Sequence, residues 1–259
     1  MDIIVCVKQV PDTGAERRLR REDGTVDRDA AAAVVNELDE FAIEEGLRLA
    51  GKHGGTVTIL SMGPERAGET IRKALAMGAD RAVHVCDPAL HGSDALVSSA
   101  VLAAALSRIG FDAVILGSES TDARTGMLAA MLAERLGLPQ LSFASLVDTD
   151  GERISIRRLA DYGYDTVEAR LPAVLSVVEK INEPRYPSFK GIMAAKKKPV
   201  QTMSLADLGL DPAMTGLAAS ATEVTGFASR PPRQAGTVVT DEGAGGIGAA
   251  EFLAARMFI

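Results

Sequence analysis

Residues 113–128 read AVILGSESTDARTGML, and this stretch joins a buried strand, a polar loop and the start of a helix. The continuous apolar run at 113–116 is typical of a parallel strand that is covered on both faces. The loop has small polar side chains and free backbone N–H groups at a helix N-terminus, which suits a phosphate group, and Arg124 could add a charged contact. The loop could instead be a helix cap in which Asp122 and Thr125 only satisfy the backbone. The residues alone leave both interpretations open.

The same alternation of strand and helix continues on either side of this stretch. Further apolar runs predict strands at residues 3–7, 57–60 and 82–85. Apolar stripes at helical spacing predict helices that begin near Leu38, Pro64, Asp94 and Leu128. This order predicts an α/β fold with a doubly wound, mostly parallel sheet. Such sheets bind ligands at the carboxyl ends of their strands, so we expect a site formed by residues 7–13, 62–63 and 117–126.

Other segments interrupt or follow this pattern. Residues 11–35 are rich in charge and contain an Asp-Gly turn, which predicts a long loop or an excursion hairpin. Beyond residue 150 we expect strands at 154–156, 166–169 and 171–178, followed by an irregular segment over 182–200. The remainder has little periodicity and is expected to lie on this domain or on a partner, with a short helix at 249–257. A G-x-G-x-x-G match at 243–248 is followed by only 11 residues, too few for a dinucleotide fold, and is interpreted as a flexible tail.

Composition excludes several classes of function. The 259 residues carry a net charge of −7, which argues against a general nucleic-acid binder. No apolar run approaches the ~20 residues of a membrane span, and no basic segment precedes an apolar stretch at the start. Cys6 and Cys86 are expected to be reduced thiols in a cytoplasmic protein. The three histidines lack metal-binding spacing, so we expect no metal site.

Residues 184–198 hold five basic residues and no acidic one. Tyr186, Phe189, Ile192 and Met193 are interleaved with these charges. Large apolar side chains on a charged loop are typical of anchors at a protein interface. The segment could therefore be a docking surface for an acidic partner or only a solvated face.

Taken together, these segments resemble the β subunit of electron-transfer flavoproteins, and the resemblance covers essentially the whole chain. The motif Glu-Ser-Thr-Asp at 119–122 is similar to that of actinobacterial members. The motifs that carry it are VKQVPDT at 7–13, NELDEFAIEE at 36–45, GP at 63–64 continuing to IRKALAMGAD at 71–80, GSESTDARTG at 117–126, LPQ at 138–140 and NEPRY at 182–186 continuing to IMAAKKK at 192–198.

The resemblance implies an electron carrier without substrate chemistry of its own. The family works as an αβ heterodimer in which one FAD, held mainly by the α subunit, passes electrons singly from acyl-CoA dehydrogenases to a membrane quinone reductase. The β subunit would be an adenine-nucleotide-binding (HUP-like) domain over 1–200, holding an AMP with a structural role. Residues 201–259 would form an extended C-terminal arm that packs on the α subunit.

The resemblance also assigns residues to these roles. The AMP contacts would be Cys6, Asn36, Glu37, Leu38, Asp39, Met62, Gly117, Ser118, Glu119, Ser120, Thr121, Asp122, Ala123, Arg124, Thr125, Gly126, Met127 and Leu128. Thr13 and Leu38 would approach the flavin of the α subunit. The recognition loop at 182–198 would dock partner dehydrogenases through Arg185, Tyr186, Phe189, Ile192, Met193, Lys196, Lys197 and Lys198, with Phe189 as its apolar anchor.

Three departures from the family pattern bear on this assignment. Glu119 brings a negative charge near the phosphate site, Ala123 replaces a Gly or Asp, and Leu159 replaces a Glu whose role near the flavin is not carried over. Two alternatives also remain open. Bifurcating relatives bind a second FAD in place of AMP and oxidise NADH, although Ala123-Arg124 departs from their loop. A stand-alone nucleotide-binding domain is the other, which the docking segment and tail disfavour.

Overall fold

The computed structural model describes the chain except residues 17, 229–230, 233–235, 237, 239 and 259. It consists of two compact units, Met1–Thr225 and Gly226–Ile259. The first unit contains all strands among the described residues, and the second contains helix α8 (Gly245–Ala255). The sequence places a boundary at residue 200, but the first compact unit extends further because residues 200–219 form elements that pack on the sheet and on α3.

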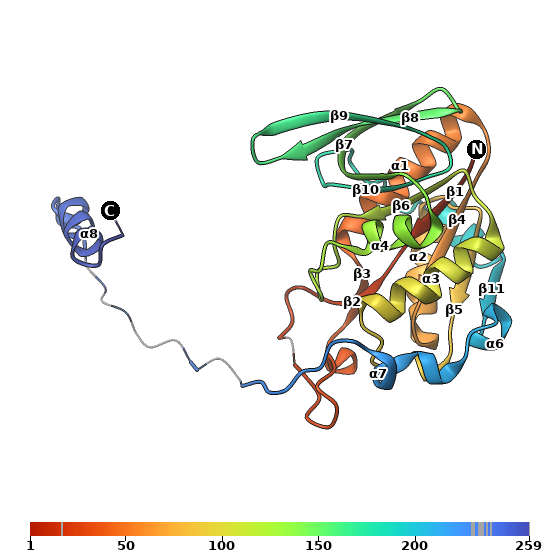
Figure 1. The fold of residues 1–259 in the computed structure, drawn as a ribbon. Helices are drawn as coiled ribbons and strands as arrows, with labels where there is room; N and C mark the ends of the chain where they lie inside the picture. The colour runs from red at the N-terminus through yellow and green to blue at the C-terminus, as the bar shows by residue number, and fades with distance from the viewer. Residues whose placement is uncertain (17, 229–230, 233–235, 237, 239, 259) are drawn as a thin grey trace. The chain divides into compact units, whose positions relative to one another are not determined.

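A nine-stranded sheet forms the centre of the first unit, in the order β11-β5-β4-β1-β6-β10-β7-β8-β9 (Figure 1). Its strands are β1 (Asp2–Cys6), β4 (Thr56–Met62), β5 (Arg81–Val85), β6 (Ala113–Gly117), β7 (Gln140–Thr149), β8 (Arg153–Ala160), β9 (Gly163–Arg170), β10 (Ala173–Val177) and β11 (Val200–Met203). All neighbours pair in parallel except β7–β8 and β8–β9, which are antiparallel. The predicted doubly wound, mostly parallel sheet is confirmed.

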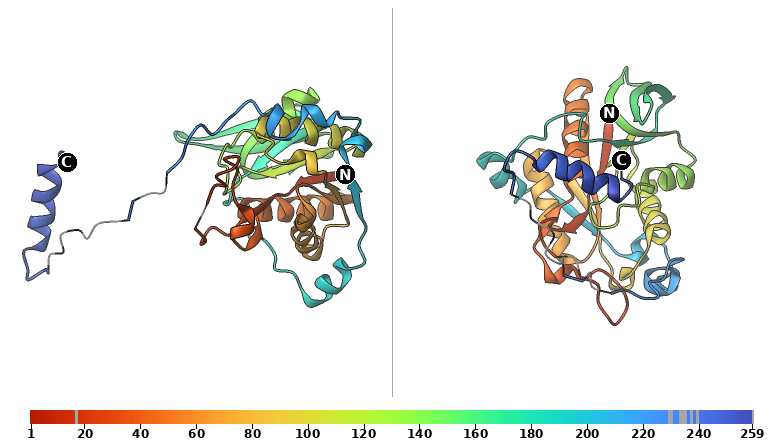
Figure 2. Two further views of the ribbon diagram at one scale, coloured as in Figure 1. Left: turned by 90° about the horizontal axis from the view of Figure 1, so that it is seen from below. Right: turned by 90° about the vertical axis from the view of Figure 1, so that its left-hand side faces the viewer.

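Helices cover both faces of this sheet (Figure 2). The larger helices are α1 (Glu37–His53), α2 (Gly68–Met77), α3 (Ala95–Ile109) and α4 (Leu128–Leu136), and the shorter ones are α5 (Phe189–Ala195), α6 (Leu205–Leu208) and α7 (Gly216–Ala219). Side chains of α1 and α2 pack on one face, and those of α3 and α4 on the other. The predicted helix starts hold, and Asp94 caps α3 by accepting from Val97 N at 2.9 Å.

The chain changes sides of the sheet between β1 and β6. The connections after β1 and β4 run through α1 and α2 on one face, whereas those after β5 and β6 run through α3 and α4 on the other. The loops after β1 and β6 therefore diverge at this point. A divergence of this kind in an open α/β sheet is where ligands bind.

Residues 11–35 form the predicted excursion. Its base is an antiparallel ladder of β2 (Gln9–Pro11) and β3 (Ala33–Val35), and a bridge between Leu19 and Val26 closes its tip. We use "the excursion" below for residues 12–32. Short 3-10 turns lie at Arg28–Ala30, Glu65–Ala67, Pro88–Leu90 and Pro212–Met214.

The structure corrects the prediction of an irregular segment over residues 182–200. Residues 189–195 are helical rather than irregular, because Ser188 Oγ accepts from Gly191 N at 3.0 Å as an N-cap and α5 packs against α2. Strands β7 and β11 were not predicted, and β8 and β9 are longer than the short runs at 154–156 and 166–169. No helix in the described part of the chain is long and apolar enough to span a membrane.

Candidate nucleotide site and docking surface

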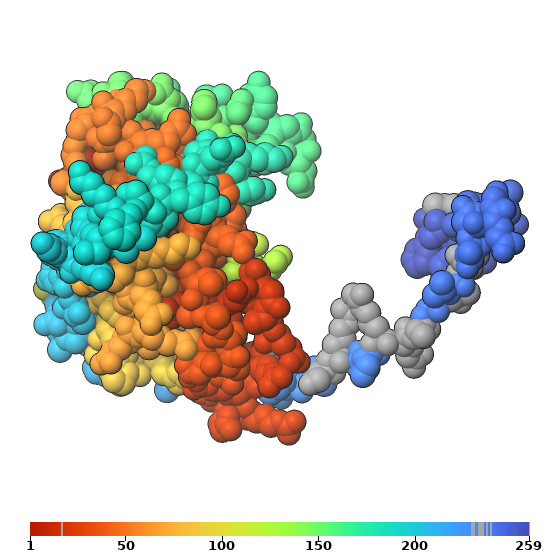
Figure 3. All heavy atoms as spheres, turned by 180° about the vertical axis from the view of Figure 1, so that it is seen from behind, coloured from red at the N-terminus to blue at the C-terminus, as the bar shows by residue number. Residues whose placement is uncertain are grey.

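The three predicted strand ends meet at one edge of the sheet. β1 lies between β4 and β6, all in parallel, so the loops that begin at Val7, Met62 and Gly117 are neighbours. In the space-filling view of Figure 3 the yellow-green atoms of the loop after β6 lie beside the red and orange atoms of the excursion. We call residues 117–127 the nucleotide loop, after the role that the sequence predicts for them.

Two buried polar residues at the start of α1 hold the loops after β1 and β6 together. Asp39 accepts from the backbone N–H of Lys8 at 2.8 Å and from that of Gly117 at 3.3 Å. Asn36 precedes α1 but makes no side-chain cap, because its amide is used elsewhere. It donates to the carbonyl of Glu119 at 2.9 Å and accepts from Thr121 N at 3.0 Å. Both residues therefore position the nucleotide loop.

Burial sets the ionisation of the groups beneath this loop. It raises the pKa of Asp39 to about 7, even though hydrogen bonds from Lys8 N, Asn36 and Gly117 N favour the carboxylate. Burial, with the nearby Asp39 carboxyl, also raises the pKa of the Cys6 thiol. Cys6 is thus a protonated thiol within the core, on the side of the sheet that α3 and α4 cover.

Asp122, an acidic residue of the nucleotide loop, forms ion pairs with two cations. Its carboxylate, 2% exposed, lies 2.8 Å from Lys8 Nζ and 2.5 Å from a guanidinium nitrogen of Arg28. Lys8 Nζ also donates to Ser120 Oγ at 3.3 Å. Burial alone would raise the pKa of Asp122, but the Lys8 ammonium and the Arg28 guanidinium lower it to about 2. The loop is therefore held by buried charge.

The end of the loop presents donors without partners. In the described structure, the N–H groups of residues 125–128 donate to no protein acceptor. Helix α4 begins at Leu128, and its N-cap residue, Met127, offers no side-chain cap. Thr121 Oγ1 is buried and also unpartnered. Asp122 binds cations rather than these amides, so the interpretation of the loop as a simple helix cap is wrong for that residue. An anion at this helix N-terminus would satisfy the free donors.

The remaining candidate residues surround this loop in different ways. Glu37 is exposed and accepts from Thr13 Oγ1 at 3.1 Å, which joins the excursion to α1. Leu38 lies against Gly117, with too little space between them for a Cβ. Met62 packs on the core beneath α3. The side chains of Ala123, Arg124 and Met127 are exposed, and Ser118 N donates to Val177 O at 3.0 Å.

Comparison with known proteins identifies the family. A model of the electron transfer flavoprotein domain matches residues 23–208. The chain is 50% identical to the electron transfer flavoprotein subunit beta of Mycobacterium bovis, over all of this chain and 99% of the relative, and 37% identical to that of Clostridium acetobutylicum, over 92% of each. It is 35% identical to the caffeyl-CoA reductase-Etf complex subunit CarD of Acetobacterium woodii, over 93% of this chain and 92% of the relative.

The chain belongs to the electron transfer flavoprotein β-subunit family. Members of this family are electron-transfer components that associate with a flavin and with an α subunit. The family membership confirms the predicted resemblance and the α/β fold class. In the described residues no group of three His, Cys, Asp or Glu side chains lies close enough to hold a metal ion.

In this flavoprotein β subunit, the recognition loop lies across α1 and α2 (Figure 3). Tyr186 and Phe189 are 95% and 81% exposed, and Ile192, Met193, Lys196 and Lys197 are exposed beside them. Two residues assigned to docking also form contacts within the domain. Arg185 forms a two-pronged ion pair with the buried Glu44, at 2.7 and 2.9 Å. Lys198 Nζ donates to three carbonyls at the end of α2, those of Leu75, Gly78 and Ala79.

These contacts fix the recognition loop at both ends. Asn182 supports the first end by donating to Glu45 Oε2 at 3.0 Å and to the carbonyl of Phe41 at 3.1 Å. Arg72 supports the second by donating to the carbonyls of Ala195 and Lys198 at 2.7 and 3.0 Å. The exposed apolar residues of α5 are thereby presented by a segment that is attached to the domain on both sides.

Residues that the sequence did not single out lie beside the predicted docking residues. A hollow of about 380 Å³ lies between α2 and α5, lined by Arg72, Lys73, Ala76, Pro187, Ile192, Ala195 and Lys196. Its lining thus combines four apolar residues with three basic ones. The adjacent Arg72-Lys73 pair in α2 was the available signal, but only the fold brings it beside the recognition loop.

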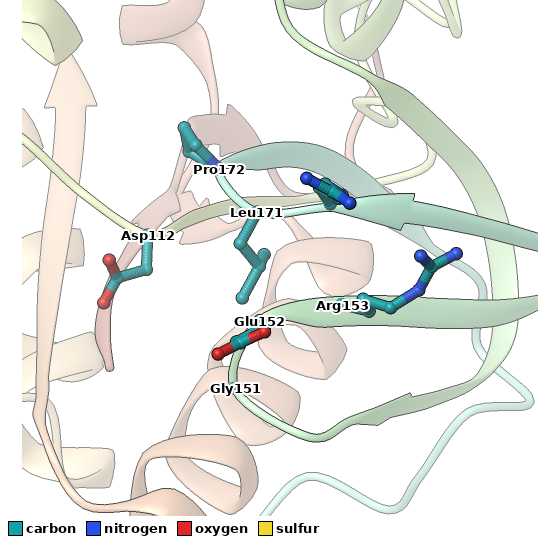
Figure 4. Close-up of a pocket in the computed structure, with 7 residues that line it drawn as sticks. Asp112, Gly151, Glu152, Arg153, Leu171 and Pro172 are labelled. Atoms are coloured by element: carbon teal, nitrogen blue, oxygen red, sulfur yellow. The ribbon is translucent and has the colours of Figure 1, made fainter.

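A second hollow lies at the opposite edge of the sheet, where β6 and β10 begin (Figure 4). It has a volume of about 440 Å³, and its lining includes Asp112, Glu152, Arg153 and Arg170. Arg153 is already paired with Glu168, and Asp112 accepts from Asp2 N at 2.7 Å. None of its residues is a candidate from the sequence, and its charges are of mixed sign at the edge where parallel sheets do not bind ligands.

Proposed function

We propose that this β subunit holds an AMP at the nucleotide loop and, with its α subunit, carries electrons from acyl-CoA dehydrogenases to a membrane quinone reductase in the cytoplasm. The unpartnered amides of residues 125–128, beside the neutralised Asp122, are the observation that supports nucleotide binding. Thr121 Oγ1 offers one further donor or acceptor. The loop thus fits a phosphate without rearrangement of its charges.

In this proposal the chain has no substrate chemistry of its own. FAD, held mainly by the α subunit, supplies the redox chemistry when bound. The residues of this chain bind and orient: Asn36 and Asp39 hold the nucleotide loop, and Thr13 and Leu38 lie on the segments that the family resemblance places toward the flavin. The recognition loop docks partner dehydrogenases through its exposed apolar residues.

The part of the C-terminal arm that forms the second compact unit, Gly226–Ile259, is proposed to pack on the α subunit. The described part of α8 has no buried residue, and its apolar side chains Ile247, Phe252 and Leu253 are exposed. A helix that is apolar around most of its surface needs a covering surface. The segment at 243–248 opens this helix, and part of the preceding strand-like stretch lies outside the described residues.

The alternative is a bifurcating complex with a second FAD at the same loop. The similarity to the caffeyl-CoA reductase-Etf complex subunit of Acetobacterium woodii favours it. Arg124 and Ala123 argue for AMP, because they depart from the small loop expected around a second flavin. The phosphate-binding amides would serve either ligand, so ligand content separates the two.

We expect one FAD and one AMP per heterodimer when the chain is purified with its α subunit, denatured and its released nucleotides are quantified by chromatography. The reason is that the free amides of residues 125–128, next to the paired carboxylate of Asp122, suit the phosphate of one adenosine nucleotide. Two FAD and no AMP, together with bleaching of the flavin by NADH, would establish the bifurcating alternative. FAD alone would contradict a nucleotide role for residues 117–128.

We expect Phe189→Ala to slow electron transfer from an acyl-CoA dehydrogenase at least tenfold at subsaturating concentrations, because an exposed aromatic anchor of an interface is worth about 2 kcal/mol or more. Stopped-flow reduction of the flavin measures this rate. The released FAD should stay at the parent level. Met214→Ala, which removes another well-exposed apolar side chain on the same unit, serves as the control and should leave the rate unchanged. Parent-like kinetics in the Phe189 variant would remove the anchor from the proposal.

A further inference from the structure

The excursion is attached to the rest of the domain by few groups between its base and its tip. At the base, Asp12 N donates to Ala32 O at 2.8 Å within the excursion, and Thr13 Oγ1 donates to Glu37 of α1 at 3.1 Å. At the tip, His91 Nε2 lies 2.7 Å from Asp23 Oδ2. Between these points, the side-chain contacts that the described structure shows to the rest of the domain gather around Arg28 and Asp29. The position of the middle of the excursion therefore depends on charge rather than on a core of its own.

Arg28 connects this middle portion to two other loops. Its guanidinium pairs with Asp122 of the nucleotide loop at 2.5 Å, across 94 residues of sequence. Its carbonyl accepts from Arg66 of the loop before α2 at 2.5 Å. Arg66 also pairs with Asp29 at 2.5 Å, and Asp29 in turn with Arg20 at the same distance. A continuous chain of charged contacts thus runs from the excursion to the nucleotide loop.

The pair between Arg28 and Asp122 is placed where its loss is costly. The Asp122 side chain is almost wholly buried, and without Arg28 its carboxylate would keep one of its two cations, Lys8, and would lose the contact to the excursion. Asp122 and its two cations, Lys8 and Arg28, together carry one net positive charge. This cluster lies at Asp122 of the nucleotide loop, and residues 125–128 at the end of the same loop present the free amides. The loop conformation that presents the amides and the position of Arg28 are therefore linked.

We propose that Arg28 is a positioning residue that couples the nucleotide loop to the excursion, so that an adenosine phosphate on the loop and a fixed excursion stabilise one another. The proposal rests on the proposed function for the identity of the ligand. Linkage requires the coupling to be mutual: what the excursion adds to nucleotide affinity, the nucleotide adds to the order of the excursion. The excursion also carries Thr13, which the family resemblance places toward the flavin. A nucleotide on the loop would therefore change the mobility of a segment that approaches the flavin.

The test compares Arg28→Gln with the parent, both as the complex with the α subunit. Amide hydrogen exchange is measured by mass spectrometry over residues 12–32 and 117–128, with and without added AMP, and AMP affinity is measured by calorimetry. Arg21→Gln is the matched control, since it removes the same charge from an exposed position of the same excursion, where the described structure gives the side chain no ion pair. Arg28→Lys keeps the cation and tests rescue.

In the parent and in Arg21→Gln, AMP should slow exchange in both segments. In Arg28→Gln it should slow exchange only at 117–128, with affinity lowered about tenfold, and Arg28→Lys should recover part of both effects. Equal slowing of residues 12–32 by AMP in Arg28→Gln and the parent would overturn the coupling. If the parent binds no AMP, the proposed function fails. The coupling is then decided without ligand: faster exchange of both segments in Arg28→Gln supports it, and unchanged exchange overturns it.

Discussion

Gly117→Ala is expected to lower the free energy of unfolding by about 3 kcal/mol and to abolish retention of the nucleotide. A Cβ at this position would lie 2.6 Å from Asp39 Oδ1 and 2.7 Å from the carbonyl carbon of Leu38. The second neighbour is backbone at the start of α1, so no side-chain rotation relieves the contact. Overpacking at a buried junction costs about 1–3 kcal/mol, and displacement of Asp39 adds the loss of its hydrogen bonds. Denaturant unfolding and quantification of released nucleotide measure the two effects.

Gly51→Ala is the matched control for this substitution. Gly51 is an exposed position within α1, and a Cβ there would meet nothing within 4 Å. Replacing a helical glycine by alanine should therefore stabilise the protein by about 0.5–1 kcal/mol. If Gly117→Ala retained its nucleotide and unfolded like the parent, the close contact of β6 with α1 would not be what shapes the nucleotide loop.

The central strands and helices could be predicted because their signals are local. β1, β4, β5 and β6 are short, predominantly apolar and β-branched runs, and strands of this kind occur where both faces of a sheet are covered. The alternation with amphipathic helices then fixes the doubly wound order. The ligand-binding edge follows from that order alone, which is why the three loops at the strand ends could be named without a structure.

The missed elements lack such local signals. β7 breaks its alternation at Phe143, which has a φ of +60° and coincides with an irregular register. β11 is four residues long and is defined by its pairing with β5. α5 lies between Pro187 and Pro199, and its packing on α2 decides its conformation over a segment that composition predicts to be irregular.

The candidate site shows the same division between local and tertiary information. The nucleotide loop is visible in sequence, but the partner of Asp122 is not, because Arg28 lies in a segment that reads only as a charged loop. The contacts of Arg185 and Lys198 within the domain could not be predicted, because basic residues that dock a partner and basic residues that hold a loop in place have the same sequence signature. Only the fold places Glu44 and the end of α2 within reach of them.

The free energy of unfolding should depend on pH through Asp39 in a direction opposite to that of most carboxylates. The pKa of Asp39 rises from its ordinary 3.8 to about 7 in the folded protein because the group is buried. The folded state then holds a proton that the unfolded state has released between about pH 4 and pH 7. Stability from this group is complete below pH 4 and is lost as the pH rises to about 7, by about 4 kcal/mol in total at about 1.4 kcal/mol per pH unit.

Asp39→Asn tests this, because the amide imitates the protonated carboxyl and does not titrate. The stability of the parent relative to Asp39→Asn should fall between pH 4 and pH 7 in denaturant titrations. Asp122→Asn is the contrasting variant, since two cations lower the pKa of Asp122 to about 2. The advantage of the parent over that variant should be constant above pH 4 and shrink as the pH falls toward 2. Parallel pH profiles for the parent and Asp39→Asn would mean that the Asp39 carboxylate is solvated or paired, and that burial does not govern the junction between α1 and the nucleotide loop.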